Sequence, residues 1–328
     1  MFGSLFNKMK LTKQETEKIV KDYNLGRLKS IKPLSGGSVN YNFTLTTFKG
    51  IFVLRIIIKK LNLKKLNLEF KALEYLNEEG FPYQIPNPVK NNKGKYLSKL
   101  NDKNIWIYEK IRGKCVKSLN EVQLKNTIKA LAIYHKHIGK FKIKAKEENE
   151  IKGLKGRLLK LSKVKPKNKL DRLMLKNLSM IEQVYEKIKD KKFNENRLLI
   201  HKDIHKKNLL FEGNQVISIL DFENIRLSPR IMDIAYLIKT TVAYGENRFM
   251  KRVNLIINEY DKTNHLTKQE KSDILLILAK DSCVMFDYFY RTSGQDIKDD
   301  GEYLCLKWTV DVVKQVVREL GWKINLKF

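Results

Sequence analysis

The chain has 328 residues, of which 42% are hydrophobic and 31% charged, so it can bury a sizeable core and is not an intrinsically disordered protein. Its length predicts about two domains or lobes. Lys and Arg outnumber Asp and Glu by 66 to 36, a formal net charge of +30. The excess is mostly lysine spread along the whole chain without a nucleic-acid-binding motif. We interpret it as a solvated surface, with a DNA or RNA face as the alternative.

The sequence also argues against a membrane or secreted protein. The three cysteines, Cys115, Cys283 and Cys305, are too few and too scattered for a disulfide framework or a zinc cluster. The longest apolar runs fall far short of the ~20 residues that a bilayer requires. The first residues lack the continuous apolar stretch and cleavage site of a signal peptide. We therefore expect a cytoplasmic protein without a membrane partner.

The N-terminal third alternates between helical and strand-like patterns. Thr12 and Glu15 form the sequence signature of a capping box, which predicts a helix over residues 11–24. Residues 28–58 switch to a period of two and contain two turns, which predicts a strand, a glycine turn and a hairpin. Residues 62–79 return to a period of 3.6 and predict a second helix.

The remaining chain is mostly helical. A second hairpin is expected at 95–100 and 104–110, followed by a helix that contains Leu131 and His135. Residues 140–197 are lysine-rich and helical in pattern, residues 198–221 are strand-like, and the chain after about residue 230 is helical. A strand-rich N-terminal part thus precedes a helical C-terminal part, which predicts an α+β fold.

One segment combines the residue types that phosphoryl transfer requires. Residues 199–211 contain the pattern His201-x-Asp203 followed by Asn208, and Asp221 follows after a turn and a β-rich run. Phosphoryl transfer uses a carboxylate to orient and deprotonate the acceptor hydroxyl, and oxygen ligands for Mg²⁺ on the nucleotide phosphates. An Asp and an Asn on one loop and a second Asp on the next hairpin supply these groups.

This segment resembles the catalytic loop and metal site of the small-molecule branch of the protein-kinase-like fold. That branch includes aminoglycoside phosphotransferases, choline and ethanolamine kinases, homoserine kinases of the kinase-like type and spore-coat kinase-like proteins. The resemblance implies that Asp203 is the catalytic base, that Asn208 and Asp221 bind Mg²⁺, and that His201 braces the loop.

Other landmarks of that branch follow in the same order over residues 30–240. Arg55 matches the strand residue that holds the phosphates, and Glu69 matches the helix glutamate that pairs with it. A solvated charge at each position is the alternative. The segment from Trp106 to Gly113, which contains Glu109 and Ile111, is similar to the hinge that lines the adenine pocket. The turn before the first strand pair is expected to cover the phosphates, with plain hairpin geometry as the alternative; it consists of Ser35, Gly36, Gly37 and Ser38.

Further positions resemble structural residues of the branch. His135 is expected to be a packed structural histidine, and Asp233 to anchor the catalytic loop by hydrogen bonds. Lys202 departs from the branch, whose usual motif is His-Gly-Asp. Protein-kinase landmarks such as Asp-Phe-Gly are absent from the sequence. Protein phosphorylation is therefore only the third choice among the functions considered.

The acceptor is expected to bind in the C-terminal part. Residues 281–302 carry a net negative charge, unlike the chain as a whole, because they contain six acidic residues and two basic ones. Aromatic residues lie between them. Acids with aromatic faces suit an amine, and the alternative is a helix with an aromatic core face and an acidic solvent face. The acids are Asp281, Asp287, Asp296, Asp299, Asp300 and Glu302; the aromatics include Phe286, Tyr288, Phe289 and Tyr290.

Together, these observations predict a two-lobed, protein-kinase-like α+β fold with an N-lobe over 1–110 and a C-lobe over 111–328. The N-lobe would hold an antiparallel sheet with one main helix. We predict an ATP- and Mg²⁺-dependent phosphotransferase that acts on a hydroxyl of a small molecule, such as an amino-alcohol, an aminoglycoside or homoserine. Nucleic acid is not expected as a partner. The alternative is a catalytically degenerate kinase-fold protein with a binding or structural role, such as a spore-coat component.

Overall fold

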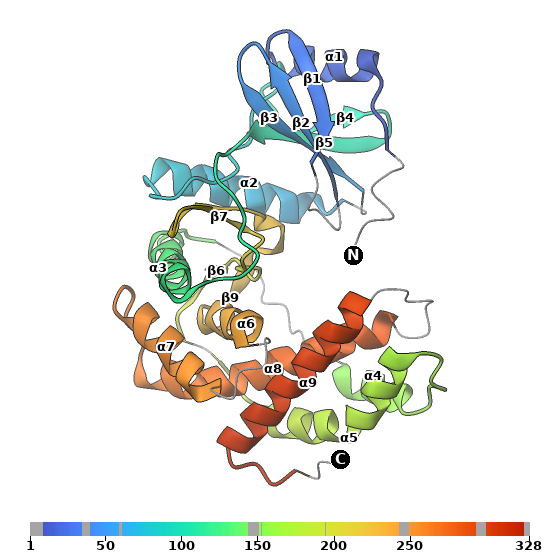
Figure 1. Ribbon diagram of the computed structural model, residues 1–328, viewed down its shortest axis with the longest axis vertical. Coiled ribbons are helices and arrows are strands. Elements are labelled where there is room, and N and C mark those ends of the chain that lie inside the picture. The colour runs from blue at the N-terminus through green and yellow to red at the C-terminus, as the bar shows by residue number, and fades with distance from the viewer. Residues whose placement is uncertain are drawn as a thin grey trace. The chain divides into compact units, whose positions relative to one another are not determined.

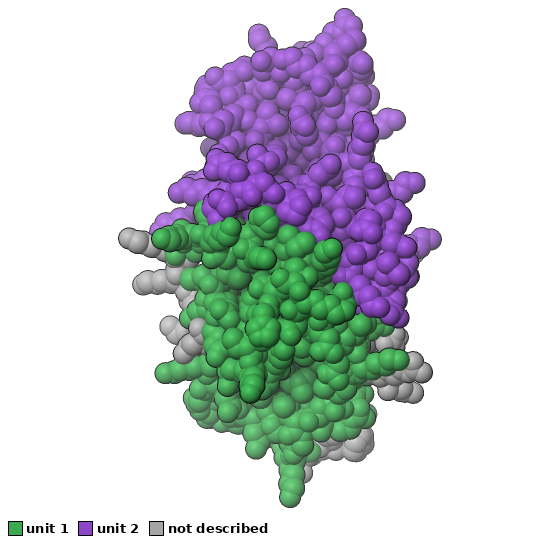
Figure 2. Space-filling view, turned by 90° about the vertical axis from the view of Figure 1, so that its left-hand side faces the viewer, with its two compact units in different colours: residues 1, 127–205, 225–328 green, residues 2–126, 206–224 purple. Residues whose placement is uncertain are grey.

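The structure is a computed structural model of the 328-residue chain. The residues that it describes are 9–34, 40–58, 61–143, 151, 153–193, 195–242, 249–292 and 300–324. These residues form two compact units, shown in Figure 2. The sheet unit contains residues 2–126 and 206–224, and the helical unit contains residues 127–205 and 225–328. The expected domain boundary between residues 110 and 111 stays a prediction, because these units are defined by contacts and not by independent folding.

The sheet unit is built on a five-stranded antiparallel sheet, in the order β1-β2-β3-β5-β4 (Figure 1). The strands are β1 (Leu28–Pro33), β2 (Asn40–Thr47), β3 (Ile51–Ile57), β4 (Ser98–Leu100) and β5 (Lys103–Glu109). The helices are α1 (Lys13–Asp22) and α2 (Leu63–Glu78). The helices and hairpins expected in this part are confirmed, including the capping box of α1, in which Thr12 and Glu15 bond each other's backbone N–H.

The alternation of side chains along β3 and β5 divides the sheet into two apolar faces. Leu54 and Ile107 pack in a cluster with Ile19 of α1. Trp106 points to the other face, where it packs with Phe70 of α2. Arg55 is the register partner of Trp106, and its guanidinium carbon lies 5.9 Å from the centre of the Trp106 ring. Arg55 therefore belongs to the α2 side of the sheet.

A short hairpin completes the sheet unit. It is formed by β7 (Leu209–Glu212) and β8 (Gln215–Ile219) and is followed by a single 3₁₀ turn, η1 (Phe222–Asn224). After β5, residues 110–114 run beside this hairpin. Lys114 there exchanges two backbone hydrogen bonds with Phe211 of β7. The hairpin thus places the segments that flank it, at Asn208 and at Asp221, beside each other.

Among its described residues, the helical unit contains most of α3 (Glu121–Ile138), six further helices and one strand pair (Figure 1). The helices are α4 (Leu154–Leu161), α5 (Lys169–Ile188), α6 (Ile231–Val242), α7 (Phe249–Asp261), α8 (Lys268–Thr292) and α9 (Asp300–Glu319). α8 packs against α4, α5, α6 and α9, which buries its central residues. In the described part of the chain, no helix is both long enough and apolar enough to cross a membrane.

The strand pair of this unit was only half predicted. β6 (Arg197–Ile200) pairs antiparallel with β9 (Arg226–Pro229), and the sequence pattern predicted strands only up to residue 221. The four residues of β9 are too few to show a clear alternation. Together with α6, this pair fixes the two ends of the segment that carries Asp203.

Candidate active site

The predicted catalytic loop begins where β6 ends, at Ile200, and is held by a carboxylate of α6. Asp233 accepts the backbone N–H of His201 at 2.8 Å and that of Lys202 at 2.6 Å. The third partner is Nε2 of His135, at 3.0 Å. Burial alone would raise the pKa of Asp233, but the hydrogen bond and charge of His135 hold it below its ordinary value. A buried anion with these partners fixes the backbone just before Asp203.

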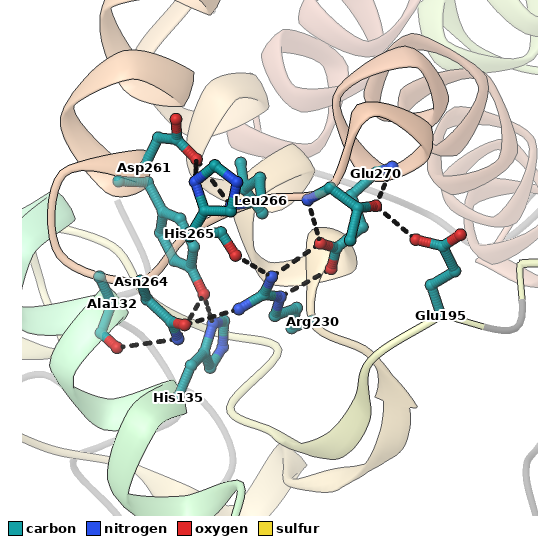
Figure 3. Close-up of polar contacts among 11 residues, drawn as sticks. Ala132, His135, Glu195, Arg230, Asp261, Asn264, His265, Leu266 and Glu270 are labelled. Carbon is teal, nitrogen blue, oxygen red and sulfur yellow. Dashed lines mark hydrogen bonds and ion pairs between the residues drawn. The ribbon is translucent and has the colours of Figure 1, made fainter.

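A larger network supports His135 (Figure 3). Nδ1 of His135 lies 2.7 Å from the hydroxyl of Tyr260. Beside it, the guanidinium of Arg230 donates to both oxygens of Glu270, at 2.6 and 2.7 Å, and to Asn264 at 2.7 Å. Because every one of these polar groups has partners, the network can be buried without the penalty of unsatisfied donors. His135 is thus a packed structural residue, as the sequence indicated.

Lys202 adopts a left-handed backbone conformation, with φ of 64°. Glycine reaches this conformation freely, whereas other residues lose roughly 1–2 kcal/mol in it. This geometry explains why the related motif carries glycine between His and Asp. Lys202 keeps the conformation because its N–H bonds Asp233 and its ammonium bonds Asp281 of α8 at 2.6 Å.

Asp203 follows at the mouth of the loop, with its side chain 19% exposed. Its Oδ1 accepts a hydrogen bond from the hydroxyl of Tyr236 at 2.6 Å, and Nε2 of His205 lies 3.4 Å from the same oxygen. Burial is the largest cause that raises the pKa of Tyr236 well above its ordinary value, and the charge of Asp203 adds to it. Tyr236 therefore remains protonated and donates a permanent hydrogen bond that orients the carboxylate.

Sequence reasoning missed Tyr236. It lies one helical turn after Asp233 in α6, so the two side chains share one face of the helix. That spacing was the available signal. The helix places one residue against the backbone of the loop and the other against its carboxylate.

Asn208 and Asp221 meet at the base of the β7–β8 hairpin, as expected. The N–H of Leu220 donates to the carbonyl of Asn208 at 2.8 Å, which joins the two segments next to both side chains. The backbone of Asp221 adopts the left-handed conformation, with φ of 64°. An amide oxygen and a carboxylate are hard donors of the kind that Mg²⁺ binds together with phosphate oxygens. No cluster of three His, Cys, Asp or Glu side chains that could hold a metal is found in the described part of the chain.

Arg55 lies beside this pair of residues. Its guanidinium forms an ion pair with Asp221 at 3.0 Å and a closer one with Glu223, which also accepts from Asn40 at 2.9 Å. Burial alone would lower the pKa of Arg55, but the charges of Asp221 and Glu69 raise it above its ordinary value. Arg55 is therefore a permanent cation against the candidate metal ligand.

Glu69 is 4% exposed on α2 and acts on Arg55 through its charge. Burial raises its pKa to about 7, and the positive charge of Arg55 opposes that rise. Among the described residues, the direct ion-pair partners of Arg55 are Asp221 and Glu223 and not Glu69. The expected pair of Arg55 with Glu69 stays a prediction.

The remaining nucleotide-binding predictions fall at the end of β5 and before β2. Glu109 ends β5, and the N–H of the next residue donates to the carbonyl of Ile51 at 2.8 Å. Glu109 and Ile111 line a groove of about 780 Å³ together with residues 81–85. Its use by adenine stays a prediction. Ser35, Gly36, Gly37 and Ser38 lie outside the described residues.

The structure changes the interpretation of the acidic segment. Asp281 is 2% exposed and pairs with Lys202 and Lys239, and Asp287 pairs with Arg157. Phe286 and Phe289 are buried in the core, which agrees with the alternative of an aromatic core face. Asp296 and Asp299 lie outside the described residues, as do the side chains of Tyr290 and Asp300. The acids at 281 and 287 are therefore already neutralised, and they do not supply the negative charge that an amine requires.

Comparison with known proteins places this site in a family. The sequence pattern of the Phosphotransferase enzyme family matches residues 30–259, which include the predicted catalytic, nucleotide-binding and metal-binding residues. The chain belongs to the Phosphotransferase enzyme family. It is 26% identical over 261 residues to the homoserine kinase of Methylobacillus flagellatus, covering 78% of each chain. It is 22% identical to the homoserine kinase of Rhizobium meliloti, covering 90% of this chain and 91% of that one.

Solved structures show the same fold at lower identity. An amicoumacin kinase, solved in complex with AMP-PNP, Ca²⁺ and Ami, matches with a TM-score of 0.68 and 16% identity, covering 93% of this chain and 94% of that one. A microcompartment-associated aminopropanol kinase matches with a TM-score of 0.68 and 12% identity, covering 93% and 97%. The expected superfamily, the α+β kinase-like fold and the assignment as a small-molecule kinase are thereby confirmed. The roles of single residues stay predictions.

Proposed function

We propose that this phosphotransferase moves the γ-phosphate of ATP, with Mg²⁺, to the hydroxyl of a small acceptor, and that homoserine is the first acceptor to test. The observation that carries the proposal is the fixed carboxylate of Asp203, held by Tyr236 on a loop whose backbone is bound by Asp233. The relatives of similar length named homoserine kinase support the choice of acceptor.

Each residue has a defined task in this proposal. Asp203 orients the acceptor hydroxyl and takes its proton, while the hydrogen bond from Tyr236 keeps the carboxylate in one rotamer. Asn208 and Asp221 would hold the metal, and Arg55 would bind phosphate oxygens in its two-pronged geometry. Mg²⁺, when bound, neutralises charge on the phosphates. The protein contributes positioning and electrostatic stabilisation and forms no covalent bond to the phosphoryl group.

The test is steady-state ATP turnover with homoserine in wild type, Asp203→Asn and Asp221→Asn. Each variant should lower kcat by at least ~10²-fold, the size expected for loss of a general base or of a metal-held charge. Asp190→Asn is the matched control, because Asp190 is exposed just after α5 and the chemical change is the same. Near-normal turnover in Asp203→Asn, with an unchanged unfolding midpoint, would refute the assignment.

A further inference from the structure

A three-residue ionic cluster, formed by Lys202, Asp281 and Lys239, lies beside the catalytic loop. One oxygen of Asp281 bonds the ammonium of Lys202 at 2.6 Å, and the other oxygen bonds the ammonium of Lys239. The side chains are only 13%, 3% and 10% exposed, respectively. Burial alone would raise the pKa of Asp281, but the two lysines hold it below its ordinary value. The cluster therefore contains two cations and one anion, a net charge of +1.

A nearly buried cation with unused donors is unfavourable unless a further anion or water satisfies it. An ammonium has three N–H donors. Among the described residues, each lysine of the cluster donates to one oxygen of Asp281. Each lysine can therefore donate to a bound anion and keep its hydrogen bond to Asp281.

The cluster adjoins the candidate catalytic base. Lys202 precedes Asp203 in the chain, and Tyr236, which bonds Asp203, lies under both ammonium groups. The ammonium nitrogens of Lys202 and Lys239 are 5.9 and 5.1 Å from the centre of the Tyr236 ring. An acceptor whose hydroxyl reaches Asp203 can therefore present its other end to the lysines across this ring.

We propose that Lys202 and Lys239 bind a carboxylate of the acceptor, so that the enzyme prefers short hydroxy acids over amino-alcohols that lack a carboxylate. This inference rests on the proposed function of Asp203. It also assigns a role to the replacement of the usual glycine by Lys202: the substitution adds a cation at the residue next to the base.

Three acceptors separate the contribution of the acceptor's carboxylate from that of its amine. L-homoserine carries both an amine and a carboxylate, 4-hydroxybutanoate lacks the amine, and 3-aminopropan-1-ol lacks the carboxylate. For wild-type enzyme, kcat/KM with each of the two acceptors that carry a carboxylate should be at least ten-fold above kcat/KM with 3-aminopropan-1-ol. Lys202→Gly and Lys239→Met should each reduce this ratio about ten-fold, mainly through KM, the factor expected for one charge-assisted hydrogen bond.

The variants are chosen to fold. Lys202→Gly places glycine at φ of 64° and leaves Asp281 paired with Lys239, so neither backbone strain nor an unpaired buried charge results. Lys251→Met, at an exposed lysine of α7, controls for the loss of one positive charge. It should leave the ratio unchanged.

Calorimetry with 4-hydroxybutanoate separates this inference from the proposed function. Binding that Lys202→Gly weakens about ten-fold, in a protein that turns over no acceptor, would support the lysine site and reject the proposed kinase reaction. Efficient turnover of 3-aminopropan-1-ol, equal to that of homoserine, would overturn the lysine site and keep the kinase. A uniform fall in kcat for all three acceptors in both variants would also overturn it, because the lysines would then act on the transferred phosphate or on the loop.

Discussion

Removing the charge of Asp233 tests whether this residue holds the catalytic loop. In wild type, each oxygen of the Asp233 carboxylate accepts a backbone N–H of the loop. In Asp233→Asn, one oxygen remains an acceptor, but the amide nitrogen that replaces the other oxygen is a donor and faces an N–H donor. Three contacts to a buried charge are reduced to one or two neutral ones. At about 1.5–3 kcal/mol for each hydrogen bond to a charged group, the loss of about two of them predicts a destabilisation of about 3–6 kcal/mol.

The effect on the whole protein follows from this magnitude. A total stability of about 5–15 kcal/mol leaves the variant folded but weakened. Its melting temperature should fall by roughly 4–9 °C, because an unfolding entropy of about 2.1 cal/mol/K for each of the 328 residues gives about 1.5 °C per kcal/mol. Because misplacement of a catalytic group by about 1 Å lowers rates about 10²-fold, kcat should fall by a similar factor.

Urea unfolding and steady-state kinetics measure these effects, with Asp190→Asn as the control. Because the folded-state pKa of Asp233 is depressed, its contribution is present above its unfolded pKa of about 3.9 and is lost as pH falls through the folded value. The stability difference between wild type and variant should therefore be largest near neutral pH and shrink in acid. A urea midpoint and kcat equal to those of wild type at pH 7 would refute the role of Asp233.

The remaining predictions concern packing, metal and thiol reactivity. Gly113→Ala should cost roughly 2–4 kcal/mol in urea unfolding, because φ is 109° and a Cβ would lie 2.7 Å from Ile217 and 3.0 Å from Leu210; an unchanged midpoint contradicts this packing. Asn208→Ala should raise the Mg²⁺ concentration for half-maximal turnover about ten-fold, as expected for one lost ligand, and an unchanged Mg²⁺ profile argues against ligation. Cys283 is fully buried and burial raises the pKa of its thiol, so iodoacetamide at pH 8 should label the two exposed cysteines and reach Cys283 only after unfolding, as read by peptide mass spectrometry.

The sequence predicted those features that depend on local pattern. The period of two over residues 28–58 predicted the first hairpin, a second was predicted at 95–100 and 104–110, and the structure confirms both. Asn208 and Asp221 could be paired because a two-strand hairpin must bring its ends together. These predictions needed only contacts between neighbouring segments.

Features that depend on distant contacts could not be predicted. The partners of Asp281 are Lys202 and Lys239, and nothing in the pattern of α8 indicates that its acid is buried against a loop and another helix. Glu223 was missed as the partner of Arg55 for the same reason. Charge counted along the sequence left two interpretations of this segment open, an amine site or a helix with an aromatic core face and an acidic solvent face. Neither anticipated that Asp281 and Asp287 form internal ion pairs.

The most direct test of the central claim is identification of the product. Wild-type enzyme and Asp203→Asn are incubated with Mg²⁺-ATP and L-homoserine, and the mixture is examined by phosphorus NMR and mass spectrometry. The account predicts a phosphate ester of homoserine, formed in step with ADP, that appears with wild type and is at least ~10²-fold slower with the variant. ADP released with free phosphate and no ester, or ester formed equally by both proteins, would contradict it.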